Sequence, residues 1–396
     1  MATINLPCPA CEHEGLELFY EQAKVPLNSM LLLKTAEEAK SFPTGALRVA
    51  VCPECGFVTN TAFDPGSAEY SVRYEASQAY SPRFNEFAKG LAQRWIDKHD
   101  IHNKVVLEIG CDKGDFLALM CELGNNTGIG LDPAVDPTRQ AEGPAAERMT
   151  FIADFYSDRY ADLPADVILC RHTLEHIPDV RRWMTGIRAA IGDQGDALVL
   201  FEIPDVRRVL EEGAFWDIYY EHCSYFTLGS LARLFRSTGF EVTNLETDFD
   251  DQYLLIEARP STTPGAGRPL PEEDDLALTV RAAEQFVGGF NRQMAEWQSM
   301  VTEVADGGGK VVVWGGGSKG VAFLLALGLD EFVPFVVDVN PFKQGNHLAT
   351  TGQKVVAPEF LREYQPQLVI AMNSIYRDEI QSQLDELGVS AKLVTV

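Results

Sequence analysis

The chain has 396 residues, of which 46% are hydrophobic and 23% charged, a composition typical of a globular protein with two or three domains. Its formal net charge of −25 disfavours general binding of nucleic acid and of anionic membranes, but a local basic pocket could still hold a phosphorylated small molecule. The sequence contains no apolar run long enough to span a bilayer, and MATINLPCPACEHEG lacks the features of a signal peptide. We therefore expect a cytoplasmic protein that acts on a small molecule.

Two closely spaced cysteine pairs, in CPAC and CPEC, stand near the start of the chain. Each spacing places two thiolates on a tight turn, and two such turns can complete a tetrahedral site for Zn²⁺. Four sulfur ligands leave no position for water, which favours a structural over a catalytic metal. We predict a zinc-binding domain over residues 1–64, with unmetallated thiols as the alternative; its ligands are Cys8, Cys11, Cys52 and Cys55.

Strand and helix signals alternate from VVLEIG (105–110) to YLLIEAR (253–259), after a tyrosine-rich connector and a helix around residues 81–100. The first strand leads into Gly110-x-x-x-Gly114, which opens a helix, and the next strand ends at Asp132. Glycines allow a ligand close to the backbone, and a carboxylate about 20 residues later can accept ribose hydroxyls. The pattern indicates a nucleotide-type cofactor, although an ordinary strand–helix turn is the alternative.

The form EIGxxxG resembles motif I of the class I S-adenosylmethionine (SAM) methyltransferases, and FIADF (151–155) and ADVILCRHTLEHI (165–177) resemble later motifs of these enzymes. The resemblance implies an α/β, doubly wound, SAM-binding domain over residues 65–260. It implies that Asp154 and Phe155 flank the adenine and that the backbone near Arg171 and His172 lines the methionine end. The implied cofactor residues are Glu108, Gly110, Gly114, Asp132, Asp154, Phe155, Arg171 and His172. For His172 and for His176, substrate contact and a packed or helix-capping role stay open.

The segment FWDIYYEHCSYF (215–226) holds three tyrosines and a Glu-His pair. The order of a four-cysteine knuckle, a SAM fold, this segment, and a C-terminal region with WGGGSKG and VDVNPFKQG resembles the sugar C-methyltransferases that act on nucleotide-linked 4-keto deoxysugars. The resemblance covers nearly the whole chain. It implies transfer of a methyl group from SAM to a carbon beside a ketone.

Methylation of such a carbon needs a base for the proton next to the ketone and a donor for the developing enolate. On the resemblance, His222 is the base, Glu221 orients it or relays its proton, and Tyr219 is the donor. Tyr74 matches a tyrosine that is expected to reach the same cavity. A purely structural role for His222 in the core is the alternative.

A second glycine turn follows a Pro- and Gly-rich segment (260–275), which reads as a surface linker, and a helix predicted over 276–304. The turn contains Gly315-x-Gly317-x-x-Gly320, and Asp338 follows the next strand. Taken alone, this pattern is a fingerprint of dinucleotide binding. The resemblance instead implies a Rossmann-like domain over 276–396 that helps to hold the substrate. The candidate contacts are Ser318, Lys319, Asp338, Asn340 and Lys343. A structural remnant and a true NAD site are the alternatives.

The chain departs from the resemblance in one notable segment. DFDDQYLLIEA stands where many relatives have a His-Gly-Gly-Ser stretch that borders the sugar. Asp250, Asp251 and Gln252 either bind a different acceptor or form a polar turn. The rival functions are O- or N-methylation of a small polar or sugar acceptor, an NAD-linked oxidoreductase, and a zinc-dependent scaffold.

Overall fold

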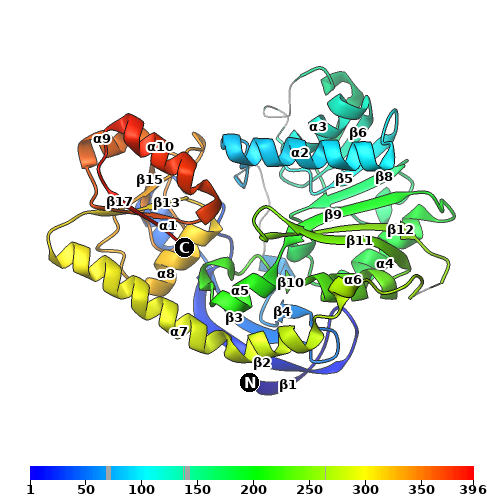
Figure 1. Cartoon of the computed structure of the whole chain (residues 1–396), viewed down its shortest axis with the longest axis horizontal. Coiled ribbons are helices and arrows are strands. Elements are labelled where there is room, and N and C mark those ends of the chain that lie inside the picture. The colour runs from blue at the N-terminus through cyan, green and yellow to red at the C-terminus, as the bar shows by residue number, and fades with distance from the viewer. Residues whose placement is uncertain (68–72, 137, 139–142, 264) are drawn as a thin grey trace.

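The computed structural model describes residues 1–67, 73–136, 138, 143–263 and 265–396, which form three β-sheets with their helices (Figure 1). None of the described helices is both long and apolar enough to cross a membrane.

The first sheet is antiparallel and has the strand order β1-β2-β3-β4-β10. The bounds are β1 (Ala2–Pro7), β2 (Glu14–Pro26), β3 (Thr44–Val51), β4 (Val58–Asn60) and β10 (Ser224–Tyr225), with helix α1 (Ala36–Lys40) between β2 and β3. The last of these strands follows the Glu-His pair directly, so the segment of the proposed base is paired with the predicted zinc domain. This long-range pairing has no signal in the local sequence.

The second sheet has the order β11-β12-β9-β8-β5-β6-β7. Its strands are β5 (Val105–Ile109), β6 (Thr127–Leu131), β7 (Met149–Ile152), β8 (Val167–Arg171), β9 (Leu198–Pro204), β11 (Phe240–Asp248) and β12 (Tyr253–Pro260). Alternating strand and helix signals, as over 105–259, are typical of a parallel sheet. The five strands from β9 to β7 are parallel, but β12 is antiparallel to both β9 and β11, because a short turn connects β11 directly to β12.

Helices cover both faces of this sheet, as a doubly wound fold requires. They are α2 (Pro82–His99), α3 (Asp115–Gly124), α4 (Val180–Ile191) and α6 (Leu228–Ser237), whereas α5 (Val206–Glu212) buries its apolar residues in a core shared by the first and third sheets. Successive strand residues point to opposite faces: Val106 packs in the core with α2 and α3, whereas Leu107 packs in the core with α4 and α6. The alternation explains why these strands are apolar almost throughout.

The third sheet is parallel, with the order β15-β14-β13-β16-β17. Its strands are β13 (Val311–Trp314), β14 (Phe335–Val337), β15 (Lys354–Val356), β16 (Leu368–Ala371) and β17 (Lys392–Thr395). The helix predicted over 276–304 is α7 (Leu276–Asp306), which packs against β2 of the first sheet through Phe286 and runs toward the third sheet (Figure 1). Helices α8 (Ser318–Leu327), α9 (Leu361–Tyr364) and α10 (Arg377–Leu387) complete this part.

The segment over 260–275 was predicted to be a surface linker, but its end packs against the protein. Glu273 and Asp275 are buried and form ion pairs with Arg236 and Arg233 of α6, at 2.7 Å and 2.8 Å. These pairs fix the start of α7 against the second sheet's helices, so the C-terminal part is anchored where it leaves the middle part.

Candidate active site and zinc site

The four predicted zinc ligands meet at the turns beside the first sheet. The Sγ atoms of Cys8 and Cys55, and those of Cys11 and Cys52, lie 3.7 Å apart, and all four lie within 4.8 Å of one another. A tetrahedral Zn²⁺ with Zn–S bonds of about 2.3 Å places its sulfurs about 3.8 Å apart. The arrangement therefore fits a four-sulfur zinc site, which would tie the two turns together.

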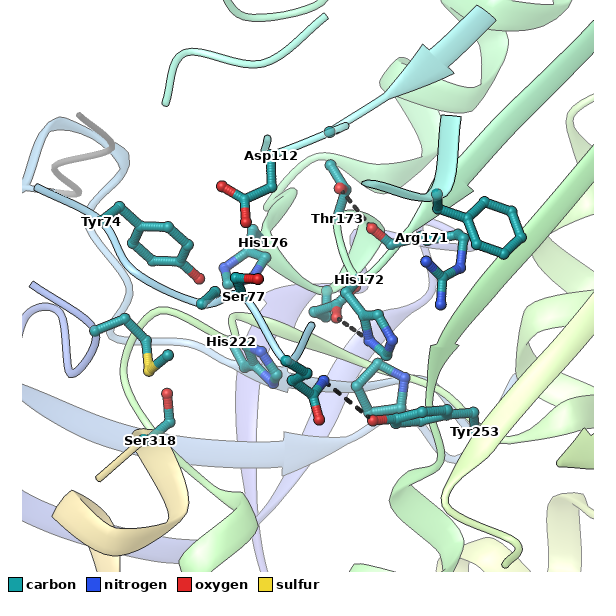
Figure 2. Close-up of a pocket in the computed structure, with 18 of the residues that line it drawn as sticks. Tyr74, Ser77, Asp112, Arg171, His172, Thr173, His176, His222, Tyr253 and Ser318 are labelled. Carbon is teal, nitrogen blue, oxygen red and sulfur yellow. Dashed lines mark hydrogen bonds and ion pairs between the residues drawn. The ribbon is translucent and has the colours of Figure 1, made fainter. Parts of the chain in front are cut away.

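A cavity of about 1100 Å³ opens between the second and third sheets. Parallel strands of both sheets end at it. In the second sheet, Gly110 follows β5 and Arg171 ends β8; in the third, Gly315 follows β13 and Met372 follows β16. Ligands of doubly wound folds bind at this edge. The cavity is thus the place where the two glycine turns and the Glu-His segment come together (Figure 2).

The first glycine turn is shaped for close approach to the backbone. Gly110 and Gly114 have φ of +77° and +86°. A Cβ atom on Gly110 would lie 1.7 Å from Thr173 Oγ1, and one on Gly114 would lie 2.5 Å from the ring of Phe151. Side chains are excluded at both positions, because each would clash and would strain the backbone.

Two carboxylates beside this turn, the buried Glu108 and the half-buried Asp132, fit the hydrogen-bond donors of SAM. Glu108 lines the cavity and has an oxygen, Oε2, without a hydrogen-bond partner among the described residues. Burial raises the pKa of Glu108 to about 8, against the opposing charge of Arg171. Asp132 accepts backbone N–H groups of Asp112 (3.0 Å) and Ala134 (2.6 Å) and also lines the cavity. Burial raises its pKa as well. Donors from a bound cofactor would stabilise both carboxylates.

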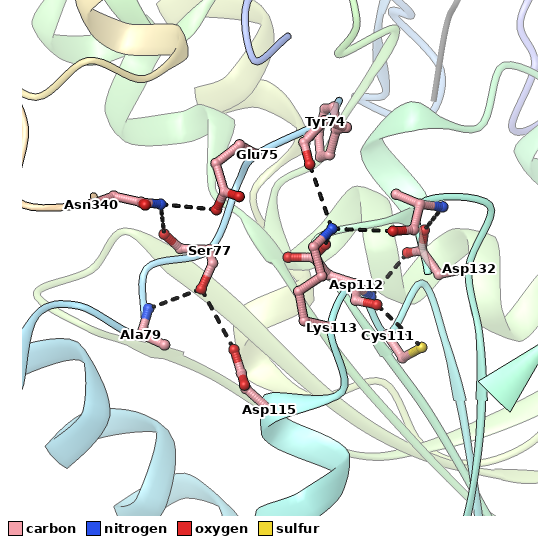
Figure 3. Close-up of polar contacts among 11 residues, drawn as sticks. Tyr74, Glu75, Ser77, Ala79, Cys111, Asp112, Lys113, Asp115, Asp132 and Asn340 are labelled. Carbon is pink, nitrogen blue, oxygen red and sulfur yellow. Dashed lines mark hydrogen bonds and ion pairs between the residues drawn. The ribbon is translucent and has the colours of Figure 1, made fainter. Parts of the chain in front are cut away.

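A lysine within the glycine turn joins this turn to two other segments of the chain (Figure 3). Lys113 is buried and donates to the Asp112 carboxylate at 2.8 Å, to the carbonyl of Ala134 at 3.1 Å and to that of Tyr74 at 3.5 Å. This contact links the tyrosine-rich connector to the glycine turn.

The predicted adenine contacts lie at the rim of the cavity. Phe155 is exposed, and Asp154 is occupied by donors from Tyr160 (2.5 Å), Arg159 (3.1 Å) and the backbone of Phe155 (2.8 Å). Both side chains line the cavity, so the position agrees with the expectation, while the adenine contact itself stays a prediction.

Arg171 and His172 form a buried ionic group with Glu202. The Arg171 guanidinium donates to both oxygens of Glu202, at 2.9 Å and 3.0 Å, and lies over the ring of Phe116. His172 Nε2 lies 2.7 Å from Glu202 Oε1, in an ion pair that is not aligned as a hydrogen bond. His172 also has φ of +48°, which is unusual for a histidine. These contacts hold Arg171 and His172, which both line the cavity, against Glu202.

The Glu-His segment places aromatic and imidazole groups at the centre of the cavity. Figure 2 shows Tyr74, His176 and His222 around one space, and the ring centroids of Tyr219 and His222 lie 4.2 Å apart. No hydrogen bond to the ring of His222 is present within the described part of the chain. Burial, with the charges of nearby His176 and His172, lowers the pKa of His222 well below its usual value. Its imidazole is therefore neutral at neutral pH and can accept a proton.

Glu221 does not meet His222 as expected. Its carboxylate is buried and accepts the backbone N–H of Ser29 at 2.8 Å and the Ser29 hydroxyl, which also contacts Ser318 Oγ. The carbonyl of Glu221 instead accepts a hydrogen bond from His176 Nδ1 at 2.9 Å. The backbone of Glu221 therefore orients His176, and Ser29 joins the Glu221 carboxylate to Ser318 of the C-terminal part.

All five predicted substrate contacts of the C-terminal part line the same cavity. Lys319 Nζ lies 3.0 Å from the Asp217 carboxylate, and Lys343 Nζ lies 3.6 Å from that of Asp338. Asp338 also accepts the backbone N–H groups of Gly316 and Asn340, each at 2.8 Å. Asn340 donates to Glu75 at 2.8 Å (Figure 3). These side chains are held in place, and two ammonium groups face the cavity.

Two family profiles match the chain: "methyltransferase domain" over residues 78–245 and "C-methyltransferase C-terminal domain" over residues 257–395. The chain is a methyltransferase. Its SAM-type domain and the C-terminal domain typical of C-methyltransferases are the second and third sheets described above, with the four-cysteine cluster before them.

Among curated proteins, the methyltransferase is similar to the C-methyltransferase NovU of Streptomyces niveus, with 27% identity over 94% of this chain and 90% of the relative. Ribosomal protein L11 methyltransferase of Pasteurella multocida is 26% identical over 31% of this chain and 40% of its own. Among solved structures, a Burkholderia thailandensis 1,6-didemethyltoxoflavin-N1-methyltransferase with bound S-adenosylhomocysteine aligns with 45% of this chain and 80% of its own, at 20% identity and a TM-score of 0.34.

Several residues of the site escaped the sequence reasoning. Ser29, Glu202 and Asn373 line or support the cavity of the methyltransferase, yet none belongs to a motif. Glu175 also lines the cavity and lies within ADVILCRHTLEHI (165–177), but the motif did not single it out. Gln252, from the departing segment, pairs with Asn373 through two side-chain hydrogen bonds of 3.0 Å and 2.7 Å. Of Asp250, Asp251 and Gln252, only Gln252 is among the cavity-lining residues. Such partners are far apart in the sequence, so local sequence patterns do not predict their contacts.

Proposed function

We propose that the methyltransferase transfers the methyl group of SAM to a carbon beside the keto group of a nucleotide-linked sugar. The unpaired imidazole of His222, held in the cavity among Tyr219, His176 and Tyr74, is the observation that carries the proposal. The C-methyltransferase C-terminal domain and the similarity to NovU support carbon as the methylated atom.

In this mechanism, a ring nitrogen of His222 takes the proton next to the ketone, and the electron pair of the broken C–H bond moves toward the ketone oxygen. Tyr219 and Tyr74 supply O–H donors for the charge that develops on that oxygen. SAM, when bound, supplies the methyl group that the resulting carbon nucleophile attacks. Glu108 and Asp132, at the first glycine turn, would hold SAM. The protein mainly holds the acceptor in line with this group.

Residues of the C-terminal part would hold the nucleotide. Ser318 and Lys319 stand at the N-terminus of α8, where backbone N–H groups are free to meet phosphate oxygens, and Lys343 adds a second positive charge. An NAD site at the same turn is less well supported, because backbone N–H groups already occupy both carboxylate oxygens of Asp338.

Exchange of the acceptor's proton with solvent tests the role of His222 separately from methyl transfer. In D₂O with S-adenosylhomocysteine and a nucleotide-linked 4-keto sugar, we expect the protein to exchange the proton next to the ketone. His222→Asn should slow this exchange at least about a hundredfold, because the base is lost. NMR of the acceptor measures the rate, and calorimetry of S-adenosylhomocysteine binding should show little change.

His102→Asn is the matched control, because His102 is exposed and absent from the cavity lining. Exchange that survives in His222→Asn at the rate of His102→Asn would contradict the assignment of the base. Equal losses of exchange and of cofactor binding would indicate a structural role for His222.

A further inference from the structure

Glu175 is a buried carboxylate that lacks a hydrogen-bond donor. The residue is 3% exposed, and neither of its carboxylate oxygens accepts a hydrogen bond from a described residue. Its ion pair with His172 Nδ1 spans 3.7 Å, which is beyond hydrogen-bond distance. A buried carboxylate without a donor is costly, so it calls for a functional explanation. Because both oxygens are buried, we look for their partner among the side chains of the protein.

The imidazole of His222 lies beside this carboxylate. One ring nitrogen of His222 is within 4.8 Å of a carboxylate oxygen of Glu175. The backbone holds the two residues next to each other, because the N–H of Cys223 donates to the carbonyl of Glu175 at 2.9 Å. The two side chains are not hydrogen-bonded in the structure. Contacts between catalytic groups are often long without a ligand and shorten when the acceptor binds.

The charges around His222 oppose its protonation. Burial and the positive charges of His176, His172 and Lys319 lower the pKa of His222 well below its usual value. A proton taken from an acceptor therefore adds positive charge where other cations already stand. A nearby negative charge would make this step easier.

Two other carboxylates close to the proposed base are engaged elsewhere. Glu202 accepts two hydrogen bonds from Arg171, at 2.9 Å and 3.0 Å. The Glu221 carboxylate accepts the backbone N–H and the hydroxyl of Ser29. Glu175 has no such donor among the described residues, so it gains most from a protonated base.

We propose that Glu175 is the positioning carboxylate of His222, a role that was expected for Glu221. Its charge favours the tautomer whose N–H faces Glu175, which leaves the lone pair of the other ring nitrogen for the acceptor, as in hydrolytic triads. When that nitrogen takes the proton, the C–H bond breaks and its electron pair moves toward the ketone oxygen. Glu175 stays ionised and stabilises the imidazolium. This inference rests on the proposed function.

Proton exchange of the acceptor measures the effect of Glu175 on the base. In D₂O with S-adenosylhomocysteine and a saturating nucleotide-linked 4-keto sugar, Glu175→Gln should slow exchange at least about tenfold, because the imidazolium loses its counter-charge. Glu175→Asp keeps the charge and should retain more exchange than Glu175→Gln. The KM for the acceptor and the affinity for S-adenosylhomocysteine should stay within about twofold.

Glu284→Gln is the matched control, because Glu284 is exposed on α7 and absent from the cavity lining. Circular dichroism checks that each variant is folded, and Glu175→Leu, which also removes the charge, takes the place of Glu175→Gln if the latter does not fold. Exchange by the folded variant at the rate of the control would overturn the proposal. Equal losses of exchange and of cofactor binding would also overturn it, because they indicate a structural role.

Nitrogen NMR tests the contact without any reaction. Labelling of histidine with ¹⁵N reports the tautomer of each ring, and His222→Asn identifies the signals of His222. We expect one dominant tautomer in the unchanged protein and in Glu284→Gln, and a mixture of both in Glu175→Gln, whose amide can donate as well as accept. The same tautomer population in all three proteins would overturn the proposal.

The two measurements separate this inference from the proposed function. If the unchanged, folded protein exchanges no proton, the proposed function fails, and the tautomer of His222 still decides whether Glu175 orients the ring. If exchange is slowed in His222→Asn but not in Glu175→Gln, the proposed function stands and the role of Glu175 is overturned.

Discussion

Glu202 is fully buried between two cations, Arg171 and His172, and this arrangement sets the charges beneath the cavity. Burial alone would raise the pKa of Glu202, but Arg171 and His172 outweigh it and hold the pKa at about 2. Burial alone would lower the pKa of His172, but Glu175 and Glu202 raise it to about 9. His172 is therefore a cation at neutral pH.

The raised pKa of His172 predicts a loss of stability in alkaline solution. The folded protein retains this proton more tightly than the unfolded chain, whose histidines have a pKa of about 6.5. The contribution is therefore complete below about pH 6.5 and is lost as the pH rises through about 9. Urea unfolding across this range should show a falling free energy of unfolding in the unchanged protein and a flatter profile in His172→Gln. Parallel profiles would contradict the assigned charge.

The turn between β5 and α3 requires glycine at position 110. Gly110→Ala should reduce the affinity for S-adenosylhomocysteine about tenfold or more, because the new Cβ would meet Thr173 Oγ1 at 1.7 Å in a left-handed backbone. Gly90→Ala, within α2, is the matched control, because its Cβ meets nothing within 4 Å. Calorimetry measures both affinities, and equal binding by the two variants would show that the turn does not shape the cofactor site.

Local sequence patterns predicted the helices and strands themselves better than which strands pair with one another. The apolar strand and glycine signals gave β5, α3, β13 and α8, because these depend on neighbouring residues. The antiparallel β12 and the pairing of β10 with β4 were not predictable, because pairing is decided by distant residues. For the same reason, the sequence predicted His222 as a site residue, because it lies in a motif, but did not predict Ser29, whose partner Glu221 is 192 positions away.

At the scale of the whole molecule, the amide pair of Gln252 and Asn373 joins the second sheet to the third across the cavity. Gln252→Ala removes this pair and should raise the KM for the acceptor about fivefold, because about 1 kcal/mol of positioning is lost. S-adenosylhomocysteine affinity should stay unchanged. Steady-state kinetics measure the effect against Gln194→Ala, an exposed control. An unchanged KM would mean that the pair does not position the two halves.

The chain joins a zinc-type knuckle, a SAM-type sheet and a C-terminal sheet around one cavity, and its central claim is that a carbon atom is methylated there. The direct measurement is NMR of the product formed from ¹³C-methyl-labelled SAM and a nucleotide-linked 4-keto sugar. We predict a new methyl group bonded to the carbon beside the ketone, absent with His222→Asn. A methyl group on oxygen or nitrogen, or no transfer by the folded, zinc-loaded protein, would contradict the account.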